Sequence, residues 1–550
     1  MRHAPFLMIA TGLLSVAGAA WVTGCGTTFD DCVSGKIGAC KGIYTETTGT
    51  GGGSTTSTTS TTGGGGTGGT IPIVCQGDPT MDPTLVDPSC GVFVRADAAA
   101  GGNGDPETPY KTLQAAIDKA TATGRWVFAC TAGEFKENVV IDEAVEVYGG
   151  FDCTDPKQWS WKKDTKAKLT GSPNAVTLTV TAAAKKVVLD DLAIKASSSA
   201  PGVMGGSSIA VVLDSVTANL NRCDITAGDA VAGANGEDAD PNAPPKPMTT
   251  AANDGKPACA VAGGGQSTGG DEIVNDCGGG MSSTGGLGGS STSGSGKAGA
   301  AGISTPPTVD MGGVAGLGDT ICAGGGNGGL GADGSTGLAG VAGTGIGTLD
   351  ATSGWVGTAG KIGDPGTPGQ GGGGGGGKKG GAMVCSNAAG SGATGGSGGA
   401  GGCGGKPGGG GRFGGSSIAL VSFNSKSAVV ALDGCKLTTG KGGDGGKGGD
   451  AQPGGVGGDA GKGGSGMPAN LPSACDGGNG GLGGNGGPGG GASGGHSLAI
   501  AYNGLKPTIV KSTLTPGTAG AAGMGGTIGG TMGPSGDPGM APADGTLMFP

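Results

Sequence analysis

The sequence has few aromatic residues, and this scarcity limits the kind of core that it can build. Aromatic side chains make up 3% of the 550 residues, whereas glycine accounts for 138 of them. Glycine adds no side chain to a core and loses more backbone entropy on folding than any other residue. The composition therefore excludes one large globular core. It favours a repeat architecture, in which each unit buries a small area against its neighbours.

Histidine and runs of basic residues are also scarce. The 32 Lys and Arg residues are scattered and the formal net charge is −10, which argues against a nucleic-acid partner because phosphate binding needs clustered cations. There is no C-x-x-C motif, and His496 is the only histidine after His3. A zinc site and a Ser/His/Asp triad are therefore disfavoured. We expect His496, between Gly495 and Ser497, to be a solvated turn residue and not a catalytic base.

No apolar run is long enough for a comfortable membrane span. The candidate run, Phe6 to Val22, is short and rich in Gly and Ala. The residues from Val22 to Cys25 resemble a bacterial lipobox. This resemblance implies a signal peptide over residues 1–24, lipidation of Cys25 and, since Gly26 is not Asp, a place in the outer membrane or at the cell surface. A cleaved signal with a coincidental cysteine is the alternative. Residues 25–70 are Thr/Gly-rich and are expected to form a polar tether.

Fourteen cysteines remain beyond Cys25, an even number that suits disulfides in an oxidising compartment. The sequence does not determine their connectivity. Pairs that are close in sequence are the natural candidates: Cys32–Cys40, Cys75–Cys90, Cys130–Cys153, Cys259–Cys277 and Cys385–Cys403.

Signals for regular structure become clear near Gly91. Thr108 and Pro109 are suited to the N-cap and first position of a helix, an apolar stripe follows from Leu113 to Ala120, and Gly124 ends it. The expected strands are Trp126–Ala129, Asn138–Ile141 and Val145–Tyr148.

The segment from Asn103 to Asp152 resembles the opening of right-handed parallel β-helix proteins of the pectin-lyase-like class. Glu134–Ile141 matches that pattern most closely, and the resemblance covers roughly residues 91–230. It implies an all-β parallel solenoid with an N-terminal capping helix. It says much less about activity, although such proteins are often polysaccharide lyases or hydrolases.

One supersecondary unit occurs three times. The stretches 205–212, 414–421 and 494–501 are alike, and a second short strand follows each of them. The equivalent positions in these second strands hold Cys223, Cys435 and Ser512. The expected organisation is cap and first coils over 71–230, a Gly-rich insert over 231–413, a coil over 414–440, an insert over 441–493, the last coil over 494–516 and a Gly-rich tail over 517–550.

The Gly-rich tracts leave the repeated unit at the same point, so we expect them to emerge side by side. Glycine recurs at every third position, without a miss from Gly325 to Gly343. This period matches a threefold extended helix of the polyproline II type, and such polyglycine helices can pack closely. The alternative is a set of flexible, disordered loops, which the low proline content and the many adjacent glycines favour.

Few residues are suited to catalysis. Asp190 and Asp191 are adjacent, so on a strand they would point to opposite faces, and a polar turn is the expected role. Arg222 lies near Asp224 in the sequence, as in an ordinary surface pair. An early aromatic cluster is expected to fill the core, with a sugar-stacking platform as the alternative; it comprises Trp126, Trp159, Trp161, Tyr148 and Phe151.

The Asp residues of the Gly runs, as in GKGGDGGKGGDA from Gly440, are similar to those of calcium-binding repeats but lack the apolar residue that such repeats need. Ca²⁺ remains an option, and no other cofactor, metal ligand or catalytic residue is assigned. The whole chain resembles the glycine-rich, PGRS-type surface lipoproteins of myxobacteria-like Gram-negatives. We therefore expect a lipid-anchored surface protein with a structural, adhesive or binding role, contacting extracellular polysaccharide or other surface proteins. A carbohydrate-active enzyme is the alternative.

Overall fold

The computed structural model describes residues 75–424, 428–467 and 470–550. The chain divides into two units, Met1–Ile71 and Pro72–Pro550, and the description that follows concerns the second. The expected signal peptide, the lipidated Cys25, the tether and the pair Cys32–Cys40 lie outside the described residues.

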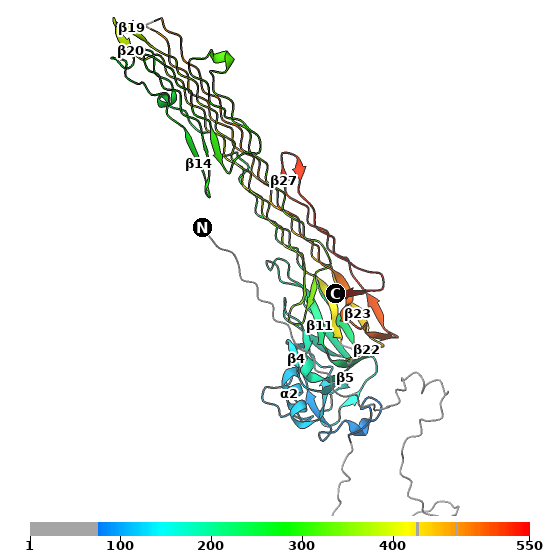
Figure 1. Cartoon of the computed structure of the whole chain (residues 1–550). Coiled ribbons are helices and arrows are strands. Elements are labelled where there is room, and N and C mark those ends of the chain that lie inside the picture. Colours follow the sequence, from blue (N-terminus) through cyan, green and yellow to red (C-terminus); the bar gives the residue numbers. More distant parts are fainter. Residues whose placement is uncertain (1–74, 425–427, 468–469) are drawn as a thin grey trace, which may run out of the picture. The chain divides into compact units, whose positions relative to one another are not determined.

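Three parallel sheets contain most of the buried side chains (Figure 1). The first has the order β1 (Gly91–Val94), β2 (Trp126–Cys130), β5 (Val145–Asp152), β9 (Lys186–Asp190), β12 (Thr217–Asn221), β22 (Val430–Asp433) and β25 (Thr508–Val510), and β6 (Ser160–Trp161) pairs antiparallel with β5. The second has the order β26 (Thr513–Thr515), β23 (Lys436–Thr438), β13 (Asp224–Thr226), β10 (Leu192–Lys195), β7 (Ala167–Thr170) and β3 (Phe135–Lys136). The third has the order β29 (Thr546–Phe549), β24 (Ser497–Gly504), β21 (Ser417–Asn424), β11 (Ser208–Asp214), β8 (Leu178–Val180) and β4 (Val139–Ile141).

The chain turns from the first sheet to the second through residues with a left-handed backbone. Asp191, Arg222, Gly434 and Lys511 follow β9, β12, β22 and β25, and their φ angles are 51°, 50°, 64° and 47°. The strands before these bends pair in register, so that Asp190 lies opposite Asn221 and Asn221 opposite Asp433. Each bend therefore lies beside its equivalent in the next turn of the chain.

The only α-helix in the described part of the chain, α2 (Leu113–Thr123), packs against β1, β2, β4 and β5. Its N-cap is Thr112, whose hydroxyl accepts from Ala115 N, and not the predicted Thr108; Gly124 ends the helix as expected. The Gln114 amide donates to Val140 O (2.9 Å) and accepts from Val140 N (2.8 Å). The helix thus satisfies backbone groups of the edge strand β4, which would otherwise be open to pairing.

The three copies of the repeated unit lie side by side in the third sheet. Ser208 pairs with Ser417 and Ser417 with Ser497 in β11, β21 and β24. In the following turns, Cys223 N donates to Cys435 Sγ (3.4 Å) and Cys435 N donates to Ser512 Oγ (2.9 Å). Cys223 and Cys435 are buried free thiols.

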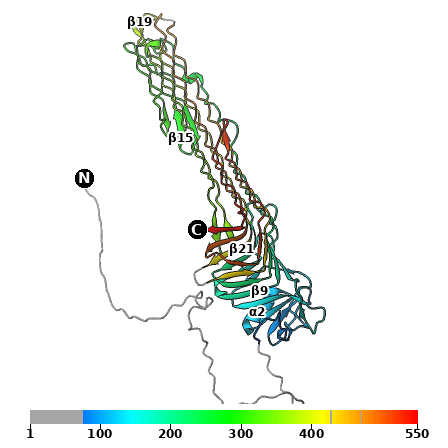
Figure 2. The ribbon, with the colours of Figure 1, turned by 90° about the vertical axis from the view of Figure 1, so that its right-hand side faces the viewer.

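The segments 229–416, 439–496 and 516–541 form what we call the glycine array: extended stretches that run side by side and bond to one another through their backbones (Figures 1 and 2). The hydrogen bonds recur at every third residue. Gly331, Gly334 and Gly337 donate to the carbonyl oxygens of residues 479, 482 and 485 at 2.7 to 2.9 Å. This recurrence matches a threefold extended helix. The segments are packed, so the expectation of flexible loops is wrong.

The glycine spacing shows how many sides of a segment touch its neighbours. In residues 331–343 only every third residue is glycine, and this edge faces the rest of the array. In the run 371–377 every residue is glycine and every one is buried. The backbone N–H groups of Gly372, Gly373 and Gly374 donate to residues 399, 329 and 300, which belong to three different segments. Glycine therefore occupies the positions at which a neighbouring backbone comes so close that a Cβ atom would overlap it.

The remaining elements are short. They are the 3₁₀ turns η1 (Pro83–Leu85), η2 (Ala182–Ala184), η3 (Ala251–Asn253) and η4 (Cys322–Gly324), and the antiparallel strands β14 (Val274–Gly278), β15 (Met281–Thr284), β16 (Ile303–Thr305), β17 (Thr348–Asp350), β18 (Gly354–Val356), β19 (Gly381–Cys385), β20 (Ala388–Gly390), β27 (Thr527–Ile528) and β28 (Thr531–Met532).

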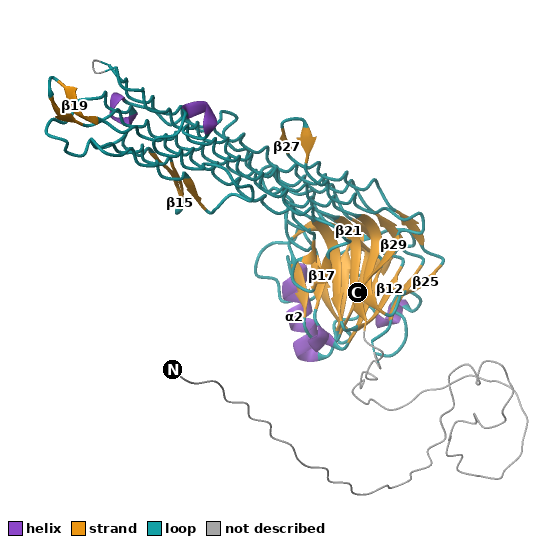
Figure 3. Ribbon diagram, turned by 45° about the horizontal axis from the view of Figure 1, so that its top comes forward, coloured by secondary structure: helices purple, strands orange, loops and turns teal. Residues whose placement is uncertain are grey.

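The predicted all-β right-handed parallel β-helix with glycine inserts is wrong as a description of this fold. The strands are short and lie in seven separate sheets, four of which are small antiparallel ones. Most of the glycine array belongs to no strand, as the loop colour of Figure 3 shows. The physical reason is that glycine, without a side chain to pack on a pleated surface, favours the threefold backbone lattice over strands.

Five disulfides cross-link the described residues: two lie in the N-terminal part of the parallel sheets and three join segments of the glycine array. Cys75–Cys90 and Cys130–Cys153 form as the sequence suggested, with sequence separations of 15 and 23. The expected Cys259–Cys277 and Cys385–Cys403 do not form, because the structure has Cys259–Cys385 and Cys277–Cys403 instead. Both bridges span 126 residues. Cys322–Cys475 is the fifth.

Candidate functional site

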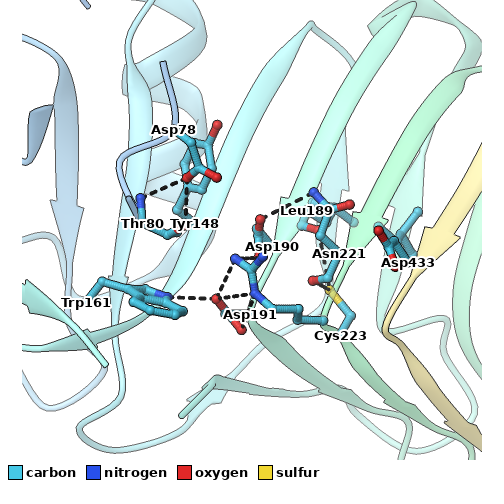
Figure 4. Close-up of polar contacts among 12 residues, drawn as sticks. Asp78, Thr80, Tyr148, Trp161, Leu189, Asp190, Asp191, Asn221, Cys223 and Asp433 are labelled. Carbon is cyan, nitrogen blue, oxygen red and sulfur yellow. Dashed lines mark hydrogen bonds and ion pairs between the residues drawn. The ribbon is translucent and has the colours of Figure 1, made fainter. Parts of the chain in front are cut away.

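Polar and charged side chains gather where β9 and β12 end (Figure 4). Asp190 is the last residue of β9, and the left-handed bend at Asp191 turns the chain, so both carboxylates reach Arg222 after β12. The expected polar turn is therefore confirmed, and because of it the two carboxylates do not point to opposite faces. The expected pairing of Arg222 with Asp224 is wrong, because the Asp224 carboxylate lies 3.1 Å from Lys166 Nζ instead.

Arg222 holds this cluster together. Its Nη2 lies 2.5 Å from Asp190 Oδ1 and 3.0 Å from Asp191 Oδ2, and its Nε donates to Asp191 Oδ1 at 3.2 Å. Trp161 Nε1 donates to Asp191 Oδ2 at 2.7 Å, and the guanidinium carbon lies 5.5 Å from the centre of the Trp161 ring. Asp191 is thus fully engaged by charge-assisted hydrogen bonds.

Asp190 is the unusual member of the cluster. Its side chain is 3% exposed, and although Arg222 is close, Oδ1 has no hydrogen bond of good geometry. Burial and, to a lesser extent, the charge of Asp191 raise the pKa of Asp190 to about 7, against the opposing effects of Arg222 and Asn221. This carboxyl can therefore gain or lose a proton near neutral pH. A bulky substrate would have to displace Arg222 to reach it.

Tyr148 borders the same cluster. Its hydroxyl donates to Glu146 Oε2 at 2.7 Å. Burial and then this hydrogen bond raise the pKa of Tyr148, and the charges of Asp78 and Asp190 act in the same direction. Tyr148 is therefore a neutral donor at any ordinary pH. Glu146, Asp190 and Asp191 thus lie around one corner of the first sheet, where Tyr148 and Arg222 engage their carboxylates.

The aromatic residues expected to fill the core do so. Tyr148, Phe151 and Trp159 are buried together with Phe93 and Phe128, while Trp126 and Trp161 are partly buried at the edge of this group. The rings of Phe93 and Trp159 meet edge to face with centroids 5.0 Å apart. This packing favours the core role over a sugar-stacking platform.

The Asp and Asn residues of the Gly tracts have a role that sequence reasoning missed. Asp229, Asn235 and Asp444 accept from the backbone N–H groups of Lys441, Lys447 and Ala521 at 2.7 to 2.9 Å. These bonds join neighbouring segments of the array. The available signal was an Asp or Asn next to a glycine in tracts that run side by side.

No group of three or more His, Cys, Asp or Glu side chains among the described residues could hold a metal ion. No helix among those residues is both long and apolar enough to cross a membrane.

His496 is the remaining residue singled out from the sequence. It is 2% exposed and lies between aromatic rings, so the expectation of a solvated turn residue is wrong. The similarity to pectin-lyase-like and PGRS-type proteins stays a prediction. No protein-family model, curated protein or solved structure shows significant similarity to the chain.

Proposed function

We propose that this chain is a lipid-anchored cell-surface protein with a structural or adhesive role and without catalytic activity. The observation that carries the proposal is the glycine array, in which long segments are held by backbone hydrogen bonds and three disulfides. Such a lattice needs few side chains for its own stability, so its outward side chains are available for contacts.

Export is supported by the chemistry of the cysteines. Ten of them form disulfides in the described residues, which is typical of oxidising compartments outside the cytosol. The lipobox-like end of the leader makes Cys25 the proposed acylation site, and several acyl chains together give a stable membrane anchor.

The outward side chains of the array suggest what it contacts. Leu330, Leu338 and Val341 are 70%, 73% and 69% exposed on one outer segment. Exposed apolar side chains that lie along one segment favour contact with another surface. The proposed partners are extracellular polysaccharide or other cell-surface proteins.

The test uses cells that make the full chain and cells that make Cys25→Ser. We expect the wild-type protein to incorporate labelled fatty acid, to be accessible to protease on intact cells and to increase binding of the cells to their own matrix polysaccharide. Cys25→Ser should be released into the medium. Wild-type protein that stays inside the cell, or surface protein that leaves adhesion unchanged, would contradict the proposal.

A carbohydrate-active enzyme is the second candidate, and the raised pKa of Asp190 is the observation that favours it. A carboxyl that titrates near pH 7 is suited to general acid catalysis. This candidate predicts release of new reducing or unsaturated ends from polysaccharide, with a loss of at least about a hundredfold in Asp190→Asn. An equal rate in wild type and variant would eliminate it.

A further inference from the structure

His496 joins two segments that are far apart in the sequence. Its Nε2 lies 2.8 Å from Ile346 O, just before β17, and its Nδ1 accepts from Met540 N at 2.8 Å, just before β29. The ring also packs edge to face between Trp355 of β18 and Phe549 of β29, at centroid distances of 5.2 and 5.8 Å. One imidazole thus holds both the hairpin β17–β18 and the last strand against the third sheet.

This arrangement fixes the protonation state of the ring. Because Nδ1 accepts from a backbone N–H, the single proton of the neutral imidazole must be on Nε2, where it can be donated to Ile346 O. A second proton on Nδ1 would face the Met540 N–H group and replace that hydrogen bond with repulsion. The ring is also buried away from water, which disfavours the charged form.

The charged groups nearby are already engaged. In the hairpin, Asp350 accepts from Ser353. In the tail segment, Asp537 accepts from Gly345 N and Asp544 lies near Lys506. Arg412, beside the Phe413 that packs on Trp355, is exposed. The neighbouring strands β21 and β24 have only Tyr502 as a titratable side chain. None of these described groups is placed to stabilise an imidazolium.

Apolar side chains lie beneath the hairpin β17–β18 and the last strand β29. Ile418, Val421 and Leu498 belong to a buried cluster that Trp355 and Phe549 cover. β29 also pairs with β24 along the edge of the third sheet. Loss of both covers would expose an apolar face together with an unpaired strand edge, which is a surface suited to association with a second copy.

We propose that His496 is an acid-sensitive clasp, whose protonation releases residues 540–549 and the hairpin β17–β18 from the third sheet. Burial lowers the pKa of His496 below its ordinary value of 6.5. The stabilising effect is therefore complete above about pH 6.5 and decreases as the pH falls below that value. This inference goes beyond the proposed surface role and does not depend on it.

The experiment measures hydrogen exchange of the full chain between pH 7.5 and pH 5, corrected for the intrinsic exchange rate. At pH 5 we expect protection of residues 344–356 and 540–549 to fall about tenfold, while the buried strand β12 is unchanged. The matched variant is His496→Asn, whose amide oxygen can accept from Met540 N without titrating. It should lose the pH dependence in both segments.

Constant protection of the wild-type segments down to pH 5, or an equal fall in His496→Asn, would overturn the proposal. If the variant does not fold, NMR titration of the wild-type imidazole decides. A ring pKa below 6.5, with the Met540 amide signal changing in step, supports the clasp. A ring pKa at or above 6.5, or an unaffected Met540 amide, overturns it.

Discussion

The three parallel sheets, which we call the three-sheet body, and the glycine array achieve close packing in opposite ways. In the body, close packing comes from side chains such as Leu220 and Ile225, which are both fully buried between the sheets. In the array, it comes from the removal of side chains, so that backbones approach and bond directly. A fold can therefore be stabilised by burial of apolar area or by a dense backbone lattice, and the two regions should respond to opposite mutations.

The largest expected effect concerns the disulfides, which differ between the regions. Cys277→Ser with Cys403→Ser removes a bridge that spans 126 residues, and because Cys259–Cys385 still joins the same stretches, it should lower the free energy of unfolding of the array by about 4 kcal/mol. Cys75→Ser with Cys90→Ser opens a closure of 15 residues, worth about 3 kcal/mol. Denaturant-dependent hydrogen exchange measures both. A smaller cost for the long closure would contradict the role of the array bridges as cross-links.

Removal of a side chain should damage the body far more than the array. Leu220→Ala empties a fully buried position and should destabilise the sheets by about 2 to 5 kcal/mol. Leu338→Ala in the array removes a side chain that is 73% exposed and should change the stability by less than about 0.5 kcal/mol. Thermal unfolding compares the two variants. Similar costs would show that the array also depends on its side chains.

Addition of a single methyl group should have the reverse effect. In Gly374→Ala the new Cβ overlaps the carbonyl group of Leu287, and we expect a loss of about 1 to 3 kcal/mol with faster proteolysis of the array. Gly294→Ala is the matched control, because a Cβ there meets no atom within 4 Å. Equal resistance of both variants to protease would argue against close backbone packing.

The smallest effect concerns the carboxylates that join array segments. Asp444→Ala removes the acceptor of the Ala521 N–H group and should cost about 0.5 to 1 kcal/mol. This hydrogen bond lowers the pKa of Asp444, so its contribution is present above about pH 4 and is lost as the pH falls further. Asp444→Asn keeps the acceptor and should show neither the cost nor the pH dependence. Exchange of the Ala521 amide is the measurement.

Much of the body was predictable because its signals are local. The apolar stripe from Leu113 to Ala120, the stop at Gly124 and the short β-branched runs all gave elements at the expected places. The two disulfides of the body were predictable for the same reason, since each joins cysteines that are near in sequence.

The neighbours within the array and the contacts of His496 were harder to predict from the sequence. The three-residue glycine period indicated extended helices that can pack, but not which segments are neighbours. The pairing of cysteines that are close in sequence was therefore wrong for Cys259–Cys277 and Cys385–Cys403. His496 follows two glycines, which suggested a turn, whereas its partners Ile346 and Met540 are 150 and 44 residues away. Such burial depends on tertiary contacts that no local pattern encodes.

The glycine period also has an evolutionary consequence. In residues 331–343 one position in three is fixed by the approach of a neighbouring backbone, and most side chains at the other two positions are exposed or half-buried. Substitutions at the outward positions leave the lattice bonds untouched, so selection can alter the chemistry of this surface without testing the fold each time. The array is therefore a scaffold whose outward side chains can be exchanged as long as its glycine spacing is kept.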